Sequence, residues 1–208
     1  MKDIKGNKTV DLSIGEFNEL RSKFEKVVID LSAGDGRFVY KSALINPNTL
    51  FIGVDPAPKQ MEEFSRKAVR KKIENVLFVV GSFELLPQEL KNCADKLYVI
   101  LPWGTLLKTV TEPTSFDVEK LRSLLKNRGE IELVFGYNSE LESSQTNRLQ
   151  LDKIDESKII QKFENAEFKL LQSSTLSSRE MKKLESTWGK RIGTTKERKI
   201  FRLVFHKC

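Results

Sequence analysis

A glycine-containing turn follows the first strongly apolar run of the chain and carries groups that could hold a cofactor. The turn is DLSAGDGR, residues 30–37. Gly34 and Gly36 allow the backbone to approach a ligand closely, and the free N–H groups at the start of the next helix face the same crevice. Asp55 ends the next apolar run, where a carboxylate can accept hydrogen bonds from both hydroxyls of a ribose. This pattern predicts a nucleoside-cofactor site. The alternative is that Asp30 and Asp55 only end strands as turn formers.

The loop after the third apolar run offers groups for the base of such a cofactor. It contains Ser82, Phe83 and Glu84. Phe83 could flank an adenine ring, and Glu84 could meet its polar edge. The three loops together favour the functional interpretation over the purely structural one.

The segment LPWG, residues 101–104, stands where the fourth apolar run ends. Leu101 cannot accept a hydrogen bond from an exocyclic amine. A ring nitrogen such as adenine N1 has an in-plane lone pair, so its methylation requires orientation more than a general base. The one histidine, His206, lies in the last predicted strand, far from these motifs. The sequence therefore predicts a site with little acid–base chemistry.

Two tryptophans could hold a nucleobase in this site. Trp103 lies within LPWG, and Trp188 lies in STWGKR, residues 186–191. An enzyme that modifies a base must take it out of its stack, and two aromatic faces can replace the lost stacking. The alternative is that each ring belongs to the core. The flanking glycine, proline and basic residues favour the clamp.

The elements that position these residues alternate between strands and helices. Strand-like runs are expected at 26–31, 50–55, 75–81, 96–101, 129–137, 167–174 and 199–207, with helices to about 46 and at 58–72, 116–127 and 155–165. Residues 138–152 are expected to form a polar connecting loop. This order predicts an α/β, Rossmann-like fold: a seven-stranded, mostly parallel sheet whose last strand is antiparallel, with helices on both faces. Ligands then bind at the carboxyl ends of the strands.

The length of 208 residues fits a single domain, 1–208. Residues 1–12 are expected to form a hairpin, and 138–154 and 174–198 to form extended connecting segments for RNA recognition. Neither a membrane span nor a leader is expected, so we predict a cytoplasmic monomer. Cys93 and Cys208 lie far apart and predict neither a metal site nor a disulfide.

The net charge of +7 and the pI near 9.3 favour a polyanionic partner. Basic residues gather in 66–72 and again in 182–202. One such cluster alone is often only a solvated helix face, but two make a nucleic-acid surface the better interpretation.

The glycine turn and its acidic partners resemble those of class I S-adenosylmethionine-dependent methyltransferases. The resemblance implies that the turn bends around the methionine part of the cofactor, and that an acidic residue after the second strand holds the ribose. Ser32 stands where that family usually has its first glycine. The cofactor contacts implied or expected are Asp30, Ser32, Gly34, Asp55, Phe83, Glu84, Leu101 and Thr105.

Nearly the whole chain resembles the aminoglycoside-resistance methyltransferases that modify N1 of adenine 1408 in 16S ribosomal RNA. The motifs are KGNKTVDL, IDLSAGDGR, IGVDP, LPWGTLL and TWGKR. The resemblance implies that the enzyme acts on the 30S subunit. It implies a catalytic site made by Trp103, Trp188, Ser186 and Pro102. It also implies rRNA contacts by Arg66, Lys67, Arg70, Lys71, Arg191, Lys196 and Arg198.

Two other functions stay open at this point. One is a small-molecule or other-RNA methyltransferase on the same scaffold, for which the basic clusters are solvated surface. The other is an RNA-binding module without catalysis, which the serine in the glycine turn would favour.

Overall fold

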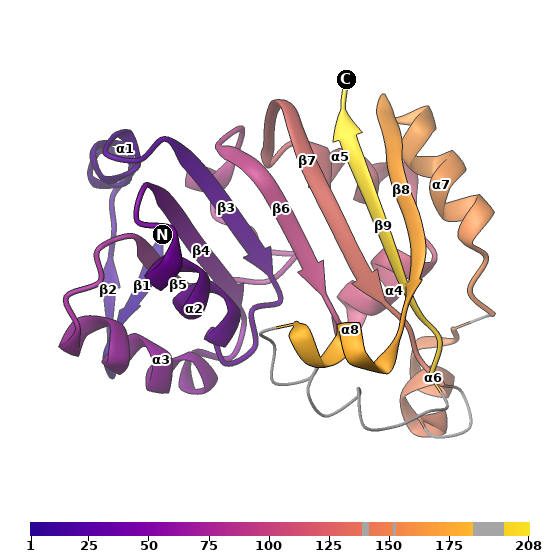
Figure 1. The fold of residues 1–208 in the computed structure, drawn as a ribbon, viewed down its shortest axis with the longest axis horizontal. Coiled ribbons are helices and arrows are strands. Elements are labelled where there is room, and N and C mark those ends of the chain that lie inside the picture. The colour runs from indigo at the N-terminus through magenta and orange to yellow at the C-terminus, as the bar shows by residue number, and fades with distance from the viewer. Residues whose placement is uncertain (139–141, 152, 185–197) are drawn as a thin grey trace.

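The computed structural model describes residues 1–138, 142–151, 153–184 and 198–208. One continuous sheet runs through this part of the molecule (Figure 1). Its strands are β1 Lys2–Lys5, β2 Lys8–Asp11, β3 Lys26–Leu31, β4 Thr49–Asp55, β5 Val76–Val80, β6 Ala94–Ile100, β7 Leu125–Phe135, β8 Phe168–Leu176 and β9 Ile200–Lys207.

The strands of the sheet lie in the order β2-β1-β5-β4-β3-β6-β7-β9-β8. The five central strands, from β5 to β7, are parallel, whereas β9 is antiparallel to both of its neighbours. The α/β class and the antiparallel last strand are thus confirmed. The predicted number of seven strands is wrong, because the N-terminal hairpin joins the sheet: β1 pairs with β5 at Asp3 and Val79.

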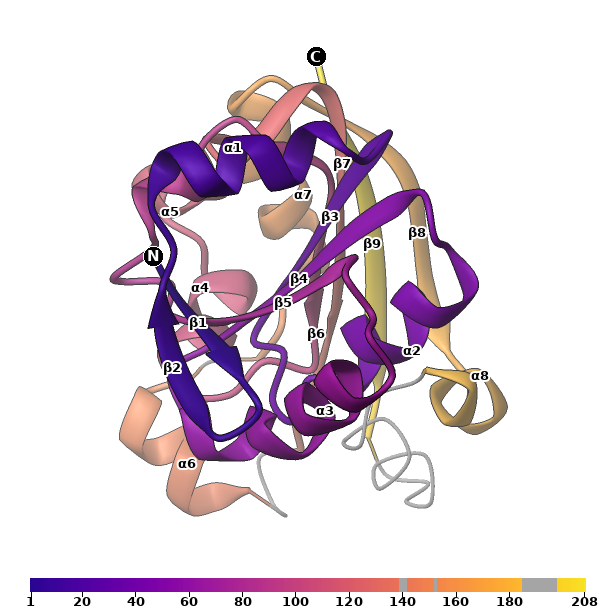
Figure 2. The same ribbon diagram turned by 90° about the vertical axis from the view of Figure 1, so that its left-hand side faces the viewer.

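Helices cover both faces of the sheet (Figure 2). They are α1 Ile14–Ser22, α2 Arg37–Ile45, α3 Pro58–Arg70, η1 Gln88–Leu90, α4 Thr105–Thr111, α5 Ser115–Arg122, α6 Ser143–Leu149, α7 Glu156–Asn165 and α8 Ser178–Lys183. Side-chain caps fix several starts: Ser13 caps α1, and Thr114 caps α5 through reciprocal bonds with Asp117. No described helix combines the length and the apolar composition that crossing a bilayer requires.

The sheet separates two apolar layers, and alternate residues of each strand enter opposite layers. Val27 and Ile29 of β3 pack on the side of α1, α4, α5 and α7, whereas Val28 packs on the side of α2 and α3. Because both faces of β3 are covered, residues of both alternating sets are apolar, with Lys26 and Asp30 as the charged exceptions. In such a sheet, ligands bind at the carboxyl ends of β3 and its parallel neighbours.

The largest boundary difference from the prediction lies between residues 116 and 129. The helix expected at 116–127 ends at Arg122, and β7 begins at Leu125 rather than near 129. The leucine- and lysine-rich sequence there resembles that of a helix. The first part of β7 pairs with β6, and the pairing contains a register shift between Ala94 and Lys96. The loop expected at 138–152 contains a short helix, α6.

Candidate active site

The predicted cofactor residues meet at the carboxyl ends of β3, β4, β5 and β6. A cavity of about 540 Å³ lies there, which is within the range of small-molecule sites. The predicted residues that line it are Ser32, Gly34, Asp55, Phe83, Glu84, Leu101, Trp103 and Thr105. Asp30 lies next to this lining, near the end of β3. Eight of the predicted site residues therefore share one cavity.

Asp55 joins two loops of the cavity wall. Its carboxylate accepts a hydrogen bond from the backbone N–H of Gly34 at 2.9 Å and another from that of Ala57 at 2.9 Å. The N–H groups of Ser32 and Ala33 both donate to the carbonyl of Val54, at 2.9 and 3.0 Å. Burial raises the pKa of Asp55, although the two backbone hydrogen bonds oppose the shift. The glycine turn is therefore held in place by the residue predicted to bind the ribose.

The turn requires left-handed backbone at three of its residues. Gly34 and Gly36 have φ of +58° and +75°, and a Cβ on Gly36 would lie 2.6 Å from the ring of Phe78. Ser32 has φ of +82°, in the region that favours glycine. Its buried Oγ has no hydrogen-bond partner among the described residues. Ser32 therefore has a strained backbone and a hydroxyl without a partner among the described residues.

We expect Ser32→Gly to stabilise the protein by about 1 kcal/mol, because glycine relieves the left-handed strain and removes the unpaired hydroxyl. The gain is reduced by the larger backbone entropy of glycine in the unfolded chain. Urea denaturation of the two proteins measures the difference. A variant less stable than the wild type would contradict this account of the turn.

Among the described carboxyl groups around the cavity, that of Asp30 has the most strongly raised pKa. Asp30 is 3% exposed, and its Oδ1 has no hydrogen-bond partner among the described residues. Burial, reinforced by the charges of Asp55 and Asp35, raises the pKa of this carboxyl group to about 8. A cationic group nearby would offset this unfavourable environment. The arrangement suits S-adenosylmethionine, whose sulfonium and ammonium groups are both positive.

The opposite wall joins the loop after β5 to α4. Glu84 accepts a hydrogen bond from the hydroxyl of Thr105, which lowers the pKa of Glu84. Lys120 donates to the carbonyl of Glu84 at 2.9 Å, and its Nζ lies 4.9 Å from the centre of the Phe83 ring. These contacts fix the loop that was predicted to flank an adenine.

The predicted acceptor site begins where β6 ends. Leu101 has φ of +51°, and its N–H donates to the carbonyl of Val134 at 2.7 Å. Such strain at a strand end commonly marks a functional site. Pro102 is buried, whereas Trp103 is half-buried and lines both the cofactor cavity and a smaller depression beside it. Trp188 and Ser186 lie outside the described residues.

An ion pair lines the same depression as Trp103. Arg198 and Glu142 both line it, with an Nη2–Oε1 distance of 2.9 Å and side chains that are each 11% exposed. Glu142 also accepts a hydrogen bond from the N–H of Asn138 at 2.9 Å. The phosphate contact of Arg198 stays a prediction. Arg191 and Lys196 lie outside the described residues.

A family model described as 16S rRNA (adenine(1408)-N(1))-methyltransferase matches residues 2–206. The chain belongs to this family. A 16S rRNA (adenine(1408)-N(1))-methyltransferase of Escherichia coli is 34% identical over 98% of this chain and 97% of its own. Membership confirms the predicted family, fold class and enzyme class, an S-adenosylmethionine-dependent rRNA methyltransferase.

Two solved structures are similar over nearly the whole chain. A 30S ribosomal A1408 methyltransferase from an uncultured bacterium, UncKam, is 36% identical, covers 100% of both chains and has a TM-score of 0.80. A family enzyme from Catenulisporales acidiphilia, solved in a mutant form with cosubstrate SAM, has a TM-score of 0.85 over 99% of this chain and 96% of its own. At 23% identity the second match bears on the fold alone.

Several residues of this methyltransferase's site were missed from the sequence. Gln60 and Asp35 line the cofactor cavity. Gln60 could have been found from its place in the first turn of the helix after Asp55. Glu142 could not, because an acidic residue in a polar connecting segment looks like any solvated charge.

The predicted rRNA residues on α3 divide into two groups in this methyltransferase. Lys67 and Arg70, with Lys71 just after the helix, line a groove beside α2. Arg66 lies outside the groove, 53% exposed and 3.4 Å from Glu62. Their roles on RNA stay predictions.

Proposed function

We propose that this enzyme methylates N1 of adenine 1408 in the 16S rRNA of the 30S subunit, and that this modification gives aminoglycoside resistance. The observation that carries the proposal is the family match over residues 2–206, joined to a cavity that Trp103 lines at the acceptor end. The names of the E. coli relative and of UncKam describe this same activity. Such a substrate would place a monomeric enzyme in the cytoplasm.

The cofactor site follows from the acidic wall of the cavity. Asp30 is proposed to face the positive methionine part, Ser32 and Gly34 to surround it, and Asp55 to accept from the ribose. Phe83, Glu84, Leu101 and Thr105 enclose the remaining part. S-adenosylmethionine supplies an electrophilic methyl group, and the chain supplies only its position. Both oxygens of Asp55 already accept backbone hydrogen bonds, so the ribose would use remaining lone pairs.

The acceptor site is proposed to hold a base that has left its stack. Trp103 would stack on one face of the adenine and Trp188 on the other, with Ser186 beside the second ring and Pro102 fixing the first. The described residues support the first half of this clamp, because Trp103 is half-buried at the cavity rather than deep in the core. Trp103 and the cavity wall would orient the lone pair of N1 toward the methyl group that S-adenosylmethionine would supply. Because this lone pair is already available at neutral pH, methylation of N1 needs no general base.

The rRNA backbone is proposed to lie across the basic surface formed by Arg66, Lys67, Arg70 and Lys71 on one side and Arg191 and Lys196 on the other. Such contacts position a substrate without reading its sequence. Arg198 is proposed to contact the same backbone, and its ion pair with Glu142 to hold the side chain in position beside Trp103.

Methylation of purified 30S subunits with labelled S-adenosylmethionine tests the proposal. We expect one methyl group per subunit and a primer-extension stop at adenine 1408, since N1 methylation blocks Watson–Crick pairing. The same assay should raise no stop when the cofactor is omitted. Incorporation elsewhere in the rRNA, or only into small molecules, would reject the proposed substrate.

A further inference from the structure

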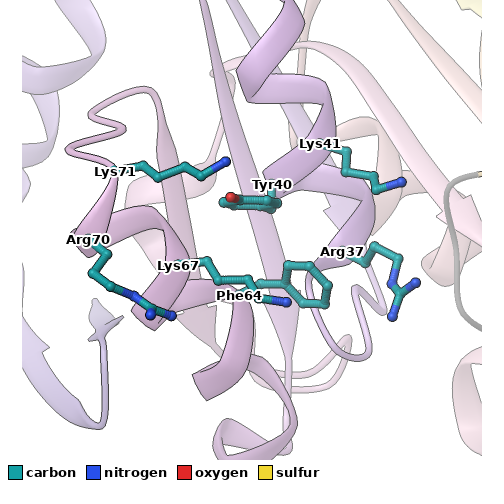
Figure 3. Close-up of a pocket in the computed structure, with 7 residues that line it drawn as sticks. All are labelled: Arg37, Tyr40, Lys41, Phe64, Lys67, Arg70 and Lys71. Carbon is teal, nitrogen blue, oxygen red and sulfur yellow. The ribbon is translucent and has the colours of Figure 1, made fainter.

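A groove of about 620 Å³ lies between α2 and α3, separate from the cofactor cavity (Figure 3). Five cationic side chains line it. Arg37 and Lys41 come from α2, and Lys67, Arg70 and Lys71 come from α3 and the residue after it. Among the described residues no carboxylate belongs to its lining. A groove lined by charge of one sign attracts ions of the opposite sign, which here are anions.

The floor of the groove is aromatic, and the rings do not reach solvent. Tyr40 and Phe64 are 5% and 4% exposed, with ring centres 5.3 Å apart. Rings buried to this extent cannot serve as stacking platforms for nucleobases, which need an open face. The groove can therefore recognise negative charge, but not a base.

The ring of Phe64 contacts two of the cations. The Nζ of Lys67 lies 4.5 Å, and the guanidinium carbon of Arg37 5.2 Å, from the centre of the Phe64 ring. Lys67 also pairs with Glu63 at 2.5 Å, and Arg37 with Asp35 at 3.6 Å. Because these side chains are already ordered, an anion loses less entropy on binding them than on binding free lysines.

The groove lies next to the cofactor turn. Arg37 is the first residue of α2, and its partner Asp35 lines the cofactor cavity. From Arg37 the lysines continue away from the active site, with Lys41 and Lys71 on opposite sides of Tyr40 (Figure 3). A chain of phosphates could therefore follow the groove from the rim of the active site.

We propose that this two-helix groove binds the phosphate backbone of the substrate RNA, and that Arg37 and Lys41 of α2 are phosphate-binding residues together with Lys67, Arg70 and Lys71. This inference rests on the proposed function for the identity of the RNA. It adds α2 to the RNA-binding surface and makes the contact independent of sequence. Five cations exceed what one phosphate needs, which favours a polyanion over a free anion.

The test variant is Lys41→Gln/Lys71→Gln, because neither lysine lines the cofactor cavity. We expect the Kd for 30S subunits to rise about tenfold or more, and the slope of log K against log salt to fall by about 1 to 2, as two phosphate contacts require. The melting temperature and the calorimetric affinity for S-adenosylmethionine should stay unchanged. The matched control is Lys158→Gln/Lys162→Gln on α7, across the molecule from the groove (Figure 1).

An unchanged Kd and salt slope would overturn the proposal, as would equal losses in the control variant. A defect seen with 30S subunits but absent with protein-free 16S rRNA would also overturn it, because the groove would then contact a ribosomal protein. The binding measurement does not depend on which nucleotide is methylated. Failure of the wild-type primer-extension stop would therefore count against the proposed function and leave the groove test intact.

Discussion

Trp103→Ala is expected to lower kcat/KM for methylation of 30S subunits by about 5- to 150-fold. Stacking of one base on an aromatic ring contributes about 1 to 3 kcal/mol, and each 1.36 kcal/mol corresponds to about a factor of ten. The ring is half-buried and lines the cavity at its acceptor end, so alanine removes one face of the proposed clamp. Single-turnover methylation at saturating S-adenosylmethionine measures the loss. Saturating S-adenosylmethionine is needed because Trp103 also lines the cofactor cavity, so its loss could weaken cofactor binding.

Two further variants separate stacking from general damage. Trp103→Phe keeps an aromatic face and should recover most of the activity. Phe116→Ala removes an aromatic ring that is 73% exposed on α5 and lines neither cavity, so it should leave methylation unchanged. If Trp103→Ala retained full activity while its fold was intact, the base would have to be held by other groups.

The parts of the site that could be predicted share one property: their residue types are restricted by local geometry. Gly34 and Gly36 were recognisable because left-handed backbone near a ligand needs glycine, and Asp55 because it ends a buried apolar strand. Even the departure at Ser32 falls at a left-handed position. The parallel arrangement of the strands near the site followed from the alternation of strands and helices.

The parts that could not be predicted depend on contacts distant in sequence. The pairing of Glu142 with Arg198 spans two polar segments with no periodic pattern. The hairpin joins the sheet through β1 and β5, which lie more than seventy residues apart. Likewise, α2 shows two cations in its sequence, and only the fold brings them opposite those of α3. Local patterns identify elements, but not which charged faces meet.

We expect the affinity for S-adenosylmethionine to rise by about 10- to 50-fold between pH 6 and pH 8. Burial, with the charges of Asp55 and Asp35, raises the pKa of Asp30 to about 8 in the free enzyme, so the group is mostly protonated at pH 6. A bound cation favours the carboxylate form. Binding must then release a proton below pH 8, and binding that releases a proton becomes tighter as pH rises.

The raised pKa of Asp30 also determines how the free energy of unfolding changes with pH. In the unfolded chain the carboxyl group of Asp30 loses its proton near the ordinary aspartate pKa of about 3.9. In the folded protein it keeps the proton until about pH 8, because burial raises its pKa. The folded state therefore binds more protons across this range, and the free enzyme loses stability as pH rises through it. Added S-adenosylmethionine should reverse part of this loss, most strongly at the upper end of the range.

Titration calorimetry at several pH values, in buffers of different ionisation enthalpy, measures both the affinity and the proton released. Asp30→Asn keeps the shape of the side chain without its charge, and should remove most of the pH dependence while weakening binding at pH 8. The matched control is Asp3→Asn. Asp3 is also buried, with its pKa raised to about 6 by burial, but it accepts from the N–H of Phe78 outside the cofactor cavity. Its variant should change stability with pH and leave cofactor binding as in the wild type. A pH-independent affinity in the wild type would mean that Asp30 does not face the cationic part of the cofactor.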